Sequence, residues 1–274
     1  MRKNAILRIV LYSLVILLLT GILLTCLGIG VFSFSLGLRS QDYIEGSGAA
    51  DAQMIRRIQI QWASGNIRLE TEDTEDICFS ESGSGDPMVY EILGDTLIIR
   101  YSKPTISIGF ISYAKKDLTV TVPYDWVCED LELEVASADI SINNWTIDQC
   151  SLDTASGECV FSDCNVNTLN IDTASGSIRY IGSLNTLDCN AASANFTGSF
   201  TNIPKSLEMD SASGDLDITL PENAGFRVTI DALSGKFHSD FPATQNGNSY
   251  FYGDEACIID FDGASGNVRI RKVN

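Results

Sequence analysis

The sequence predicts an all-β fold, a single-stranded β-helix or β-solenoid with coils of about 19 residues, preceded by one N-terminal transmembrane helix. Three observations support this prediction. An Ala-Ser-Gly tripeptide recurs along the chain, apolar residues stand at fixed offsets from its serine, and a long uncharged apolar run lies near the first residue. The 274 residues suffice for one large domain or two small ones.

The apolar run predicts a membrane anchor. Residues 9–38 carry no charged side chain, and residues 9–34 exceed the about 20 residues that a spanning helix needs. Arg2, Lys3 and Arg8 precede the run and no acidic residue does, so the positive-inside rule keeps the N-terminus in the cytoplasm. We therefore predict a single-pass protein of the cell membrane. It has a cytoplasmic tail at residues 1–8, a transmembrane helix at 9–34, a flexible stalk at 35–53 and an extracytoplasmic domain at 54–274.

Two other interpretations of the N-terminus are less favoured. A cleaved signal peptide has a shorter apolar region, and residues 37–40 make a poor cleavage site. A lipid anchor would use Cys26, but the bulky Thr25 precedes it where a small residue is wanted.

The repeat organises the rest of the chain. Its serines are Ser64, Ser137, Ser156, Ser175, Ser193, Ser213, Ser234 and Ser265. Three residues after each serine stand Ile67, Ile140, Cys159, Ile178, Phe196, Leu216, Phe237 and Val268. The residues four and six positions before each serine are also apolar, with cysteine counted as a small hydrophobic residue.

Alternation of apolar and polar residues around these positions predicts strands with one buried face. A unit of about 19 residues cannot bury enough apolar surface alone, so the units must stack on one another as in a β-solenoid. Residues 70–130 lack the tripeptide and are interpreted as an irregular first part or cap. Residues 240–253, rich in Asn, Gly, Ser and Tyr, are interpreted as a loop.

The net charge of the predicted extracytoplasmic domain limits the kinds of partner that it can bind. Beyond the predicted span there are 36 acidic and 15 basic residues, a net charge of −21. Such a domain repels nucleic acid, which binds through lysine and arginine, and it suits a cation or a basic partner. We expect no nucleic acid partner, a membrane contact through the N-terminal helix, and a cell-wall glycan or an envelope protein as ligand.

Seven cysteines lie beyond the span, an odd number that cannot pair completely within one chain. We interpret most of them as reduced core residues, with one or two disulfides as the alternative. His238 is the only histidine, and no Cys-x-x-Cys spacing occurs, so a zinc site is not expected. Trp126, Trp145 and residues 250–252 could form a sugar-binding platform, but we favour a role at the ends of the core.

Acidic residues recur three positions before the serines. This column contains Gln61, Glu134, Asp153, Asp172, Asn190, Asp210, Asp231 and Asp262. The favoured interpretation is a solvated structural ladder. One alternative is a Ca²⁺-binding edge formed by Asp153, Asp172, Asp210, Asp231 and Asp262, because hard cations prefer oxygen ligands.

A second alternative for the column is glycan hydrolysis by Asp153, Asp172 or Asp210, because glycosidases use paired carboxylates. A catalytic site needs one place where pKa values differ, whereas this column repeats evenly. We assign no catalytic residue, no cofactor apart from the Ca²⁺ alternative, and no enzymatic activity.

The repeated Ala-Ser-Gly-x-Ile units, Val120-Thr-Val-Pro123 and the stretch at residues 220–228 resemble the bacterial "putative adhesin" domain of LiaG-like envelope proteins. The resemblance covers residues 54–274 and implies a β-helical, membrane-anchored envelope protein without catalytic residues. It implies adhesion, with an accessory or sensing role in an envelope-stress response as the alternative. A polysaccharide-active β-helix enzyme is the third hypothesis.

Overall fold

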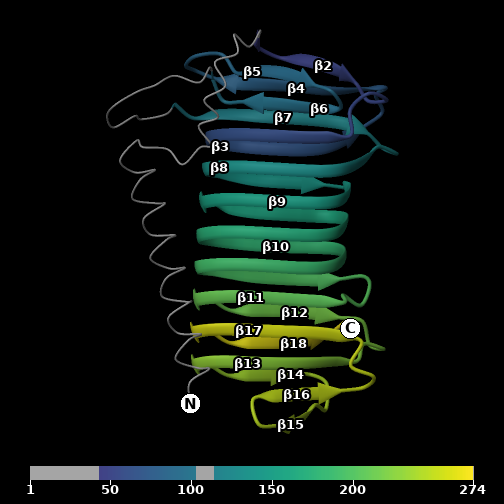
Figure 1. Ribbon diagram of the computed structural model, residues 1–274, viewed down its shortest axis with the longest axis vertical. Helices are drawn as coiled ribbons and strands as arrows, with labels where there is room; N and C mark the ends of the chain where they lie inside the picture. The colour runs from purple at the N-terminus through teal and green to yellow at the C-terminus, as the bar shows by residue number, and fades with distance from the viewer. Residues whose placement is uncertain (1–42, 103–113, 274) are drawn as a thin grey trace. The chain divides into compact units, whose positions relative to one another are not determined.

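The computed structural model describes residues 43–102 and 114–273, and every regular element in these ranges is a β-strand. The strands join into one sheet, in which most pairs are parallel, and the sheet winds into stacked coils (Figure 1). The strands are β1 (Ile44–Glu45), β2 (Gly48–Asp51), β3 (Arg57–Glu72), β4 (Asp76–Gly83), β5 (Val89–Leu93), β6 (Thr96–Arg100), β7 (Lys116–Pro123), β8 (Val127–Asn143), β9 (Thr146–Ser156), β10 (Glu158–Phe200), β11 (Ser206–Ser213), β12 (Leu216–Leu220), β13 (Phe226–Ser234), β14 (Phe237–Ser239), β15 (Thr244–Asn246), β16 (Ser249–Tyr252), β17 (Cys257–Ser265) and β18 (Val268–Lys272).

The predicted cytoplasmic tail and transmembrane helix, residues 1–34, lie outside the described residues. Within residues 43–102 and 114–273, no helix has the length and apolar character needed to cross a membrane.

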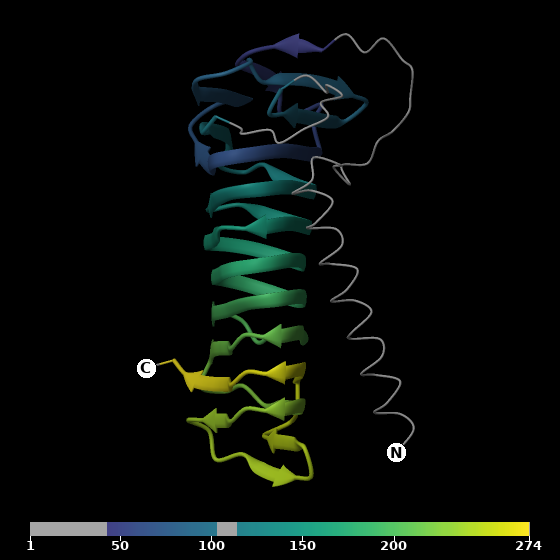
Figure 2. The ribbon, with the colours of Figure 1, turned by 90° about the vertical axis from the view of Figure 1, so that its left-hand side faces the viewer.

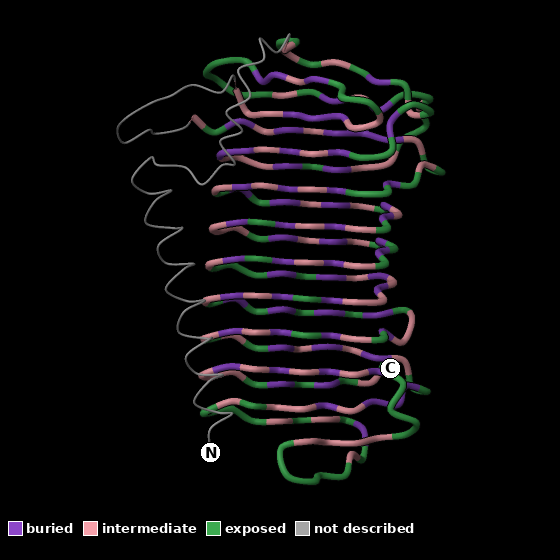
Figure 3. Tube along the Cα trace, in the orientation of Figure 1, coloured by how far each residue is buried: buried purple, intermediate pink, exposed green. Residues whose placement is uncertain are grey.

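Each regular coil contains two strands that meet at the repeated serine. β9 pairs in parallel with β8 up to Ser156, and the first residues of β10 pair with the end of β8 after the turn. Figure 2 shows the successive coils as stacked layers. Buried residues alternate with more exposed ones along the strands of the regular coils (Figure 3), and the buried residues of both strands share one core. We call the outward side of the strands that precede the serines the first face.

The predicted apolar columns are confirmed by the register. Ile140 pairs with Ile67 on one side and with Cys159 on the other, while Leu216 pairs with Phe196 and Val268. All six residues are at most 2% exposed. The sequence repeat therefore corresponds to a continuous buried column, as an all-β solenoid requires.

Glycine follows the repeated serine because coils approach closely at this turn. A Cβ atom on Gly157 would stand 2.2 Å from the carbonyl oxygen of Ala138 in the preceding coil. Gly157 also has φ of 139°, a conformation that side chains with a Cβ rarely adopt. The turn at Gly157 therefore needs glycine both for space and for its backbone conformation, whereas alanine follows the serine at Ser137 and Ser193.

The order of the coils in space differs from their order in the chain at both ends. The β17–β18 coil lies between the β11–β12 and β13–β14 coils, because β17 pairs in parallel with both β11 and β13. Likewise β3 lies between β8 and the strands β6 and β7. Both terminal coils of the repeat are thus internal strands with a neighbour on each side (Figure 1).

Antiparallel strands cover the two ends of the stack. At one end β4 pairs with β7 and with β2, β5 pairs with β6 and with β1, and at the other end β16 pairs with β13 and β15. Antiparallel hairpins occupy edges that parallel coils would otherwise leave unpaired. The structure contains β4 to β7 within residues 70–130, the predicted irregular segment.

Two predictions about connecting segments are wrong. The flexible stalk predicted for residues 35–53 is ordered where it is described, since β1 and β2 belong to the sheet and Ala50 is buried. The loop predicted for residues 240–253 contains the β15–β16 hairpin. Both segments are rich in small polar residues, which suit hairpin strands at a sheet end as well as loops.

Gly198 makes room for an aromatic ring in the core. It occupies an inward position, and a Cβ atom there would stand 2.6 Å from Cζ of Phe200. The Phe200 ring lies 5.9 Å from Tyr180, whose ring lies 5.5 Å from Phe161. Because the core is close-packed, an added side chain at Gly198 must displace Phe200.

We expect Gly198→Leu to lower the free energy of unfolding by about 1–3 kcal/mol, the usual effect of overpacking. Thr197→Leu, an outward and exposed neighbour, is the control and should change it by less than about 0.5 kcal/mol. Urea denaturation of both variants measures the difference. Equal stability of the two variants would contradict this account of the core.

Candidate functional site

The carboxylate column forms a ladder on the first face. Register pairs Glu134 with Asp153, Asp153 with Asp172, and Asn190 with Asp210. At the far end of the stack Asp262 pairs with both Asp210 and Asp231. The predicted residues are therefore neighbours in adjacent coils, in the spatial order 153, 172, 190, 210, 262 and 231.

Partial burial and like charge raise the pKa of Asp153, Asp172, Asp210 and Asp262. The pKa of Asp210 is raised to about 6, first by desolvation and then by the carboxylates of Asp262, Glu208 and Asp188. Desolvation, followed by the charge of Asp231, also raises the pKa of Asp262. The ladder thus gathers repelling charges that a folded chain holds about one coil spacing apart, about 4.8 Å.

The structure gives no special place to the glycosidase candidates. Asp153 and Asp172 are direct neighbours, and the pKa of each is raised mainly by desolvation. Asp210 stands two coils beyond Asp172, separated from it by Asn190. The pKa of Asp210 is raised first by desolvation and then by several neighbouring carboxylates, so the shift does not distinguish an acid from a base.

The calcium alternative is not supported by a ligand cluster. In the described part of the chain, no three His, Cys, Asp or Glu side chains are arranged to hold a metal ion. Each coil supplies one carboxylate of the predicted set of Asp153, Asp172, Asp210, Asp231 and Asp262, spread along five coils rather than around one point.

The predicted aromatic platform is not assembled on the surface. Trp145 is 2% exposed, and the indole of Trp126 donates hydrogen bonds to the carbonyl oxygens of Ala52 and Ile55. Tyr250 stacks on Phe237 with ring centroids 4.0 Å apart. Tyr250 packs in the terminal β15–β16 hairpin, as the favoured interpretation expects, whereas Trp126 and Trp145 pack against each other beside β8 and β9, within the stack.

The cysteines fill the apolar columns. All seven cysteines in the described ranges are free, and six are buried. Burial raises the pKa of the thiols of Cys128, Cys159 and Cys189 to about 12. A protonated thiol is a weak nucleophile and a weak metal ligand, so these residues act here as small core side chains.

A groove runs along the serine edge of the last four coils. Its volume is about 550 Å³. The lining residues occupy the same three positions in each of four successive coils: Ser193, Ala194, Asn195, Ser213, Gly214, Asp215, Ser265, Gly266, Asn267, Ser234, Gly235 and Lys236. The groove is therefore polar, and it crosses the point where the β17–β18 coil is inserted.

Side-chain oxygens connect the coils along this groove. Asn195 Oδ1 accepts a hydrogen bond from the Asp215 amide at 2.9 Å, and Asp215 Oδ1 accepts one from the Asn267 amide at 2.7 Å. Asn267 Oδ1 in turn accepts from the Lys236 amide at 3.2 Å. Among the described residues, the hydroxyls of Ser193, Ser213 and Ser265 and the ammonium of Lys236 bind no other protein group, so they remain available to a ligand.

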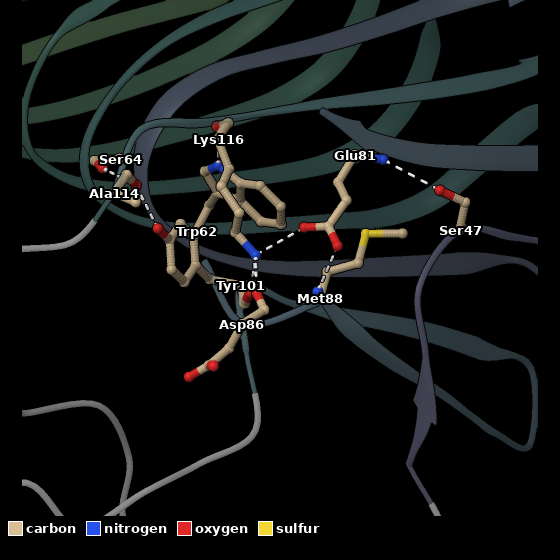
Figure 4. Close-up of polar contacts among 9 residues, drawn as sticks. All are labelled: Ser47, Trp62, Ser64, Glu81, Asp86, Met88, Tyr101, Ala114 and Lys116. Carbon is tan, nitrogen blue, oxygen red and sulfur yellow. Dashed lines mark hydrogen bonds and ion pairs between the residues drawn. The ribbon is translucent and has the colours of Figure 1, made fainter. Parts of the chain in front are cut away.

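A buried lysine fastens the antiparallel end of the stack (Figure 4). Lys116 is 2% exposed, and its Nζ atom donates to Glu81 Oε2 at 2.7 Å, to the Asp86 carbonyl oxygen at 2.8 Å and to the Tyr101 carbonyl oxygen. The ammonium also lies over the rings of Tyr101 and Trp62, at 4.0 Å and 5.2 Å from their centroids. All of these contacts are internal, so this ion pair holds β4, β6 and β7 together.

Sequence reasoning missed both the groove and the Lys116–Glu81 pair. A signal for the pair was present, because Lys116 precedes Leu118, Val120 and Val122 at the inward positions of an alternating strand. The groove had no comparable signal, since its lining residues resemble those of every other turn.

Acidification from pH 7 to pH 5 should stabilise the fold through the ladder. An unfolded aspartate has a pKa of about 3.9, below the value of about 6 for folded Asp210. Between these values the folded chain binds more protons, so stability rises as pH falls through 6. Urea midpoints measured at each pH check this expectation.

Asp210→Asn should raise the free energy of unfolding at pH 7. It should also reduce the increase in that free energy between pH 7 and pH 5. Glu222→Gln, an exposed change in the β12–β13 connection, serves as the control. An Asp210→Asn variant that is less stable at pH 7, or that keeps the full pH dependence, would show that the desolvated and repelled charge of Asp210 does not destabilise the fold.

Replacing Lys116 by methionine should destabilise the fold by about 1–3 kcal/mol, because the partly buried Glu81 loses its cationic partner and keeps only the hydrogen bond from the Met88 amide. The double variant Lys116→Met and Glu81→Gln should recover much of that loss. Denaturation of the single and double variants measures the coupling, and purely additive losses would rule it out.

The chain was compared with protein-family models, curated proteins and solved structures. A family model described as toastrack DUF4097 matches residues 55–184 and 181–271. The two matched stretches include all eight repeated serines. No curated protein matches the chain.

Several solved structures are also similar, at low identity. A "putative adhesin" from Bacteroides fragilis is 16% identical, with a TM-score of 0.47, over 85% of this chain and 98% of that one. A "putative cell adhesion protein" from Clostridium sporogenes is 12% identical, with a TM-score of 0.36, over 85% and 100%. A "putative lipid binding protein" from Parabacteroides distasonis is 16% identical, with a TM-score of 0.39, over 84% and 99%.

Proposed function

Because this chain belongs to the toastrack DUF4097 family, we propose that its coil stack is a non-enzymatic binding scaffold of the cell envelope. Residues 9–34 anchor it in the membrane with residues 1–8 in the cytoplasm, and the coils face outward. There they make adhesin-like contacts with a cell-wall glycan or an envelope protein.

The evenness of the coils is the observation that supports binding over catalysis. Acidic residues stand at one spacing through most of the successive coils, and desolvation is the first cause of the raised pKa at each of Asp153, Asp210 and Asp262. Catalysis needs an acid and a base with separated pKa values at one point. A repeated surface instead offers many similar contacts, which suits an extended ligand.

The membrane orientation is tested with the full chain in bacterial spheroplasts, tagged at either end. We expect external protease to remove the C-terminal tag and to spare the N-terminal one. Protection of the C-terminal tag would refute an outward-facing stack.

Binding is tested by sedimenting the full chain, in detergent micelles, with purified cell-wall sacculi and separately with membrane vesicles stripped of the chain. We expect saturable retention on one of them, without release of soluble sugar. Heat-unfolded chain is the control for adsorption. No retention on either, or steady release of sugar, would overturn the proposal.

A further inference from the structure

We infer that the groove along the serine edge binds an extended, neutral polysaccharide that lies parallel to the stack. This inference rests on the proposed function and names the ligand class and the site. The groove is distinct from the carboxylate ladder, which lies on the first face, three residues before the serines.

The groove offers hydrogen-bonding groups at regular intervals. Ser193, Ser213 and Ser265 come from adjacent coils, as their register shows, and adjacent strands are about 4.8 Å apart. That interval is close to the length of one sugar ring in an extended chain. Each serine hydroxyl can donate and accept, which suits ring hydroxyls that do the same.

The charges in the groove favour a neutral ligand. Asp215 and Lys236 are its only ionic residues, and they carry opposite charges. Lys236 offers donors, while Asp215 Oδ2 makes no hydrogen bond within the described chain and offers an acceptor. An anionic polymer would meet the net charge of −21 carried by residues beyond the anchor.

Ser211 supplies a second, independent indication of a ligand beside this groove. It is fully buried, and its hydroxyl has no hydrogen-bond partner in the described chain. Thr154 and Thr173, at the same position in other coils, direct their hydroxyls at the turn and donate to the carbonyl oxygens of Ser156 and Ser175.

The unpartnered hydroxyl lies against the floor of the groove. Ser211 Oγ is 3.1 Å from the position that a Cβ atom on Gly214 would take, and Gly214 lines the groove. A buried hydroxyl without a partner is unfavourable. A small shift of the Gly214 turn on ligand binding would bring the hydroxyl within reach of the Ser213 carbonyl oxygen, the acceptor that Thr154 and Thr173 use in their own coils, which links the orphan hydroxyl to an occupied groove.

The test uses the full chain in micelles of a detergent without a sugar head group. The probes are cellohexaose and the hexamer of N-acetylglucosamine as neutral chains, with hexagalacturonate as the anionic comparator. We expect calorimetric titration to detect binding of at least one neutral probe and weaker binding of the anionic one. Binding of neither neutral probe, or a preference for the anionic one, overturns the inference.

Matched variants place the binding in the groove. Ser213→Trp fills it and should weaken binding by at least about tenfold, whereas Ser175→Trp, at the equivalent exposed position outside the groove, should leave it within about twofold. Lys236→Met should weaken binding relative to Arg179→Met. If Ser213→Trp and Ser175→Trp weaken binding equally, the groove is not the binding site.

Two further measurements distinguish failure of the groove from misfolding of a variant and from failure of the proposed function. If Ser213→Trp unfolds the chain, the double variant Ser213→Ala and Ser265→Ala removes two hydroxyls without added bulk and should weaken binding about tenfold. Unchanged binding by that variant overturns the site. If Ser213→Trp is retained on sacculi as well as the unmodified chain is, the groove is not the binding site, whereas the proposed function stands. If the unmodified chain is retained neither on sacculi nor on membrane vesicles, the proposed function fails as well.

Discussion

Stacking of inward side chains in parallel register is the constraint on which this structure depends. A coil of about 19 residues has two short strands and buries almost nothing by itself. When Ile140 lies between Ile67 and Cys159, each coil covers the apolar surface of its neighbours. The burial is continuous through the stack, so the stability of any coil depends on the coils on both sides.

The same register determines the surface. If inward residues align, the outward residues three positions before each serine must align as well, and carboxylates are brought into a ladder whether or not their repulsion is useful. Neighbouring turns also come close together, which makes glycine necessary at positions such as 157. The polar edge and the charged face are therefore consequences of one repeat, and binding would use surfaces that the core already positions.

Much of this could be predicted from the sequence because inward and outward positions alternate regularly around a marked serine. The column through Ile67, Ile140 and Leu216 and the ladder through Asp153, Asp172 and Asp210 both follow from that spacing. The spatial order of the coils does not follow, because any coil with matching columns can stack on any other. Only three-dimensional pairing shows β17 between β11 and β13.

Other features depended on single exceptions to the pattern. Gly198 leaves a gap that Phe200 fills, and Lys116 pairs with Glu81 inside the cap. The repeat spacing alone does not indicate that Phe200 contacts Gly198 or that Glu81 contacts Lys116. Ser211 differs from the threonines at its position only by a methyl group, so its unpartnered hydroxyl could not be expected. These exceptions involve contacts between residues from different elements, which a periodic pattern does not specify.

Cross-linking across the ladder tests the coil order most directly. Both cysteine pairs are introduced in a Cys78→Ser background. Asp210→Cys with Asp262→Cys places the two thiols in adjacent coils. Asp210→Cys with Asp231→Cys places them two coils apart, beyond the about 7 Å between Cα atoms over which a disulfide can close. Under mild oxidation of the folded full chain, the account predicts an intramolecular disulfide in the first pair and none in the second. A disulfide in the second pair without one in the first would contradict the stacked order and the groove built upon it.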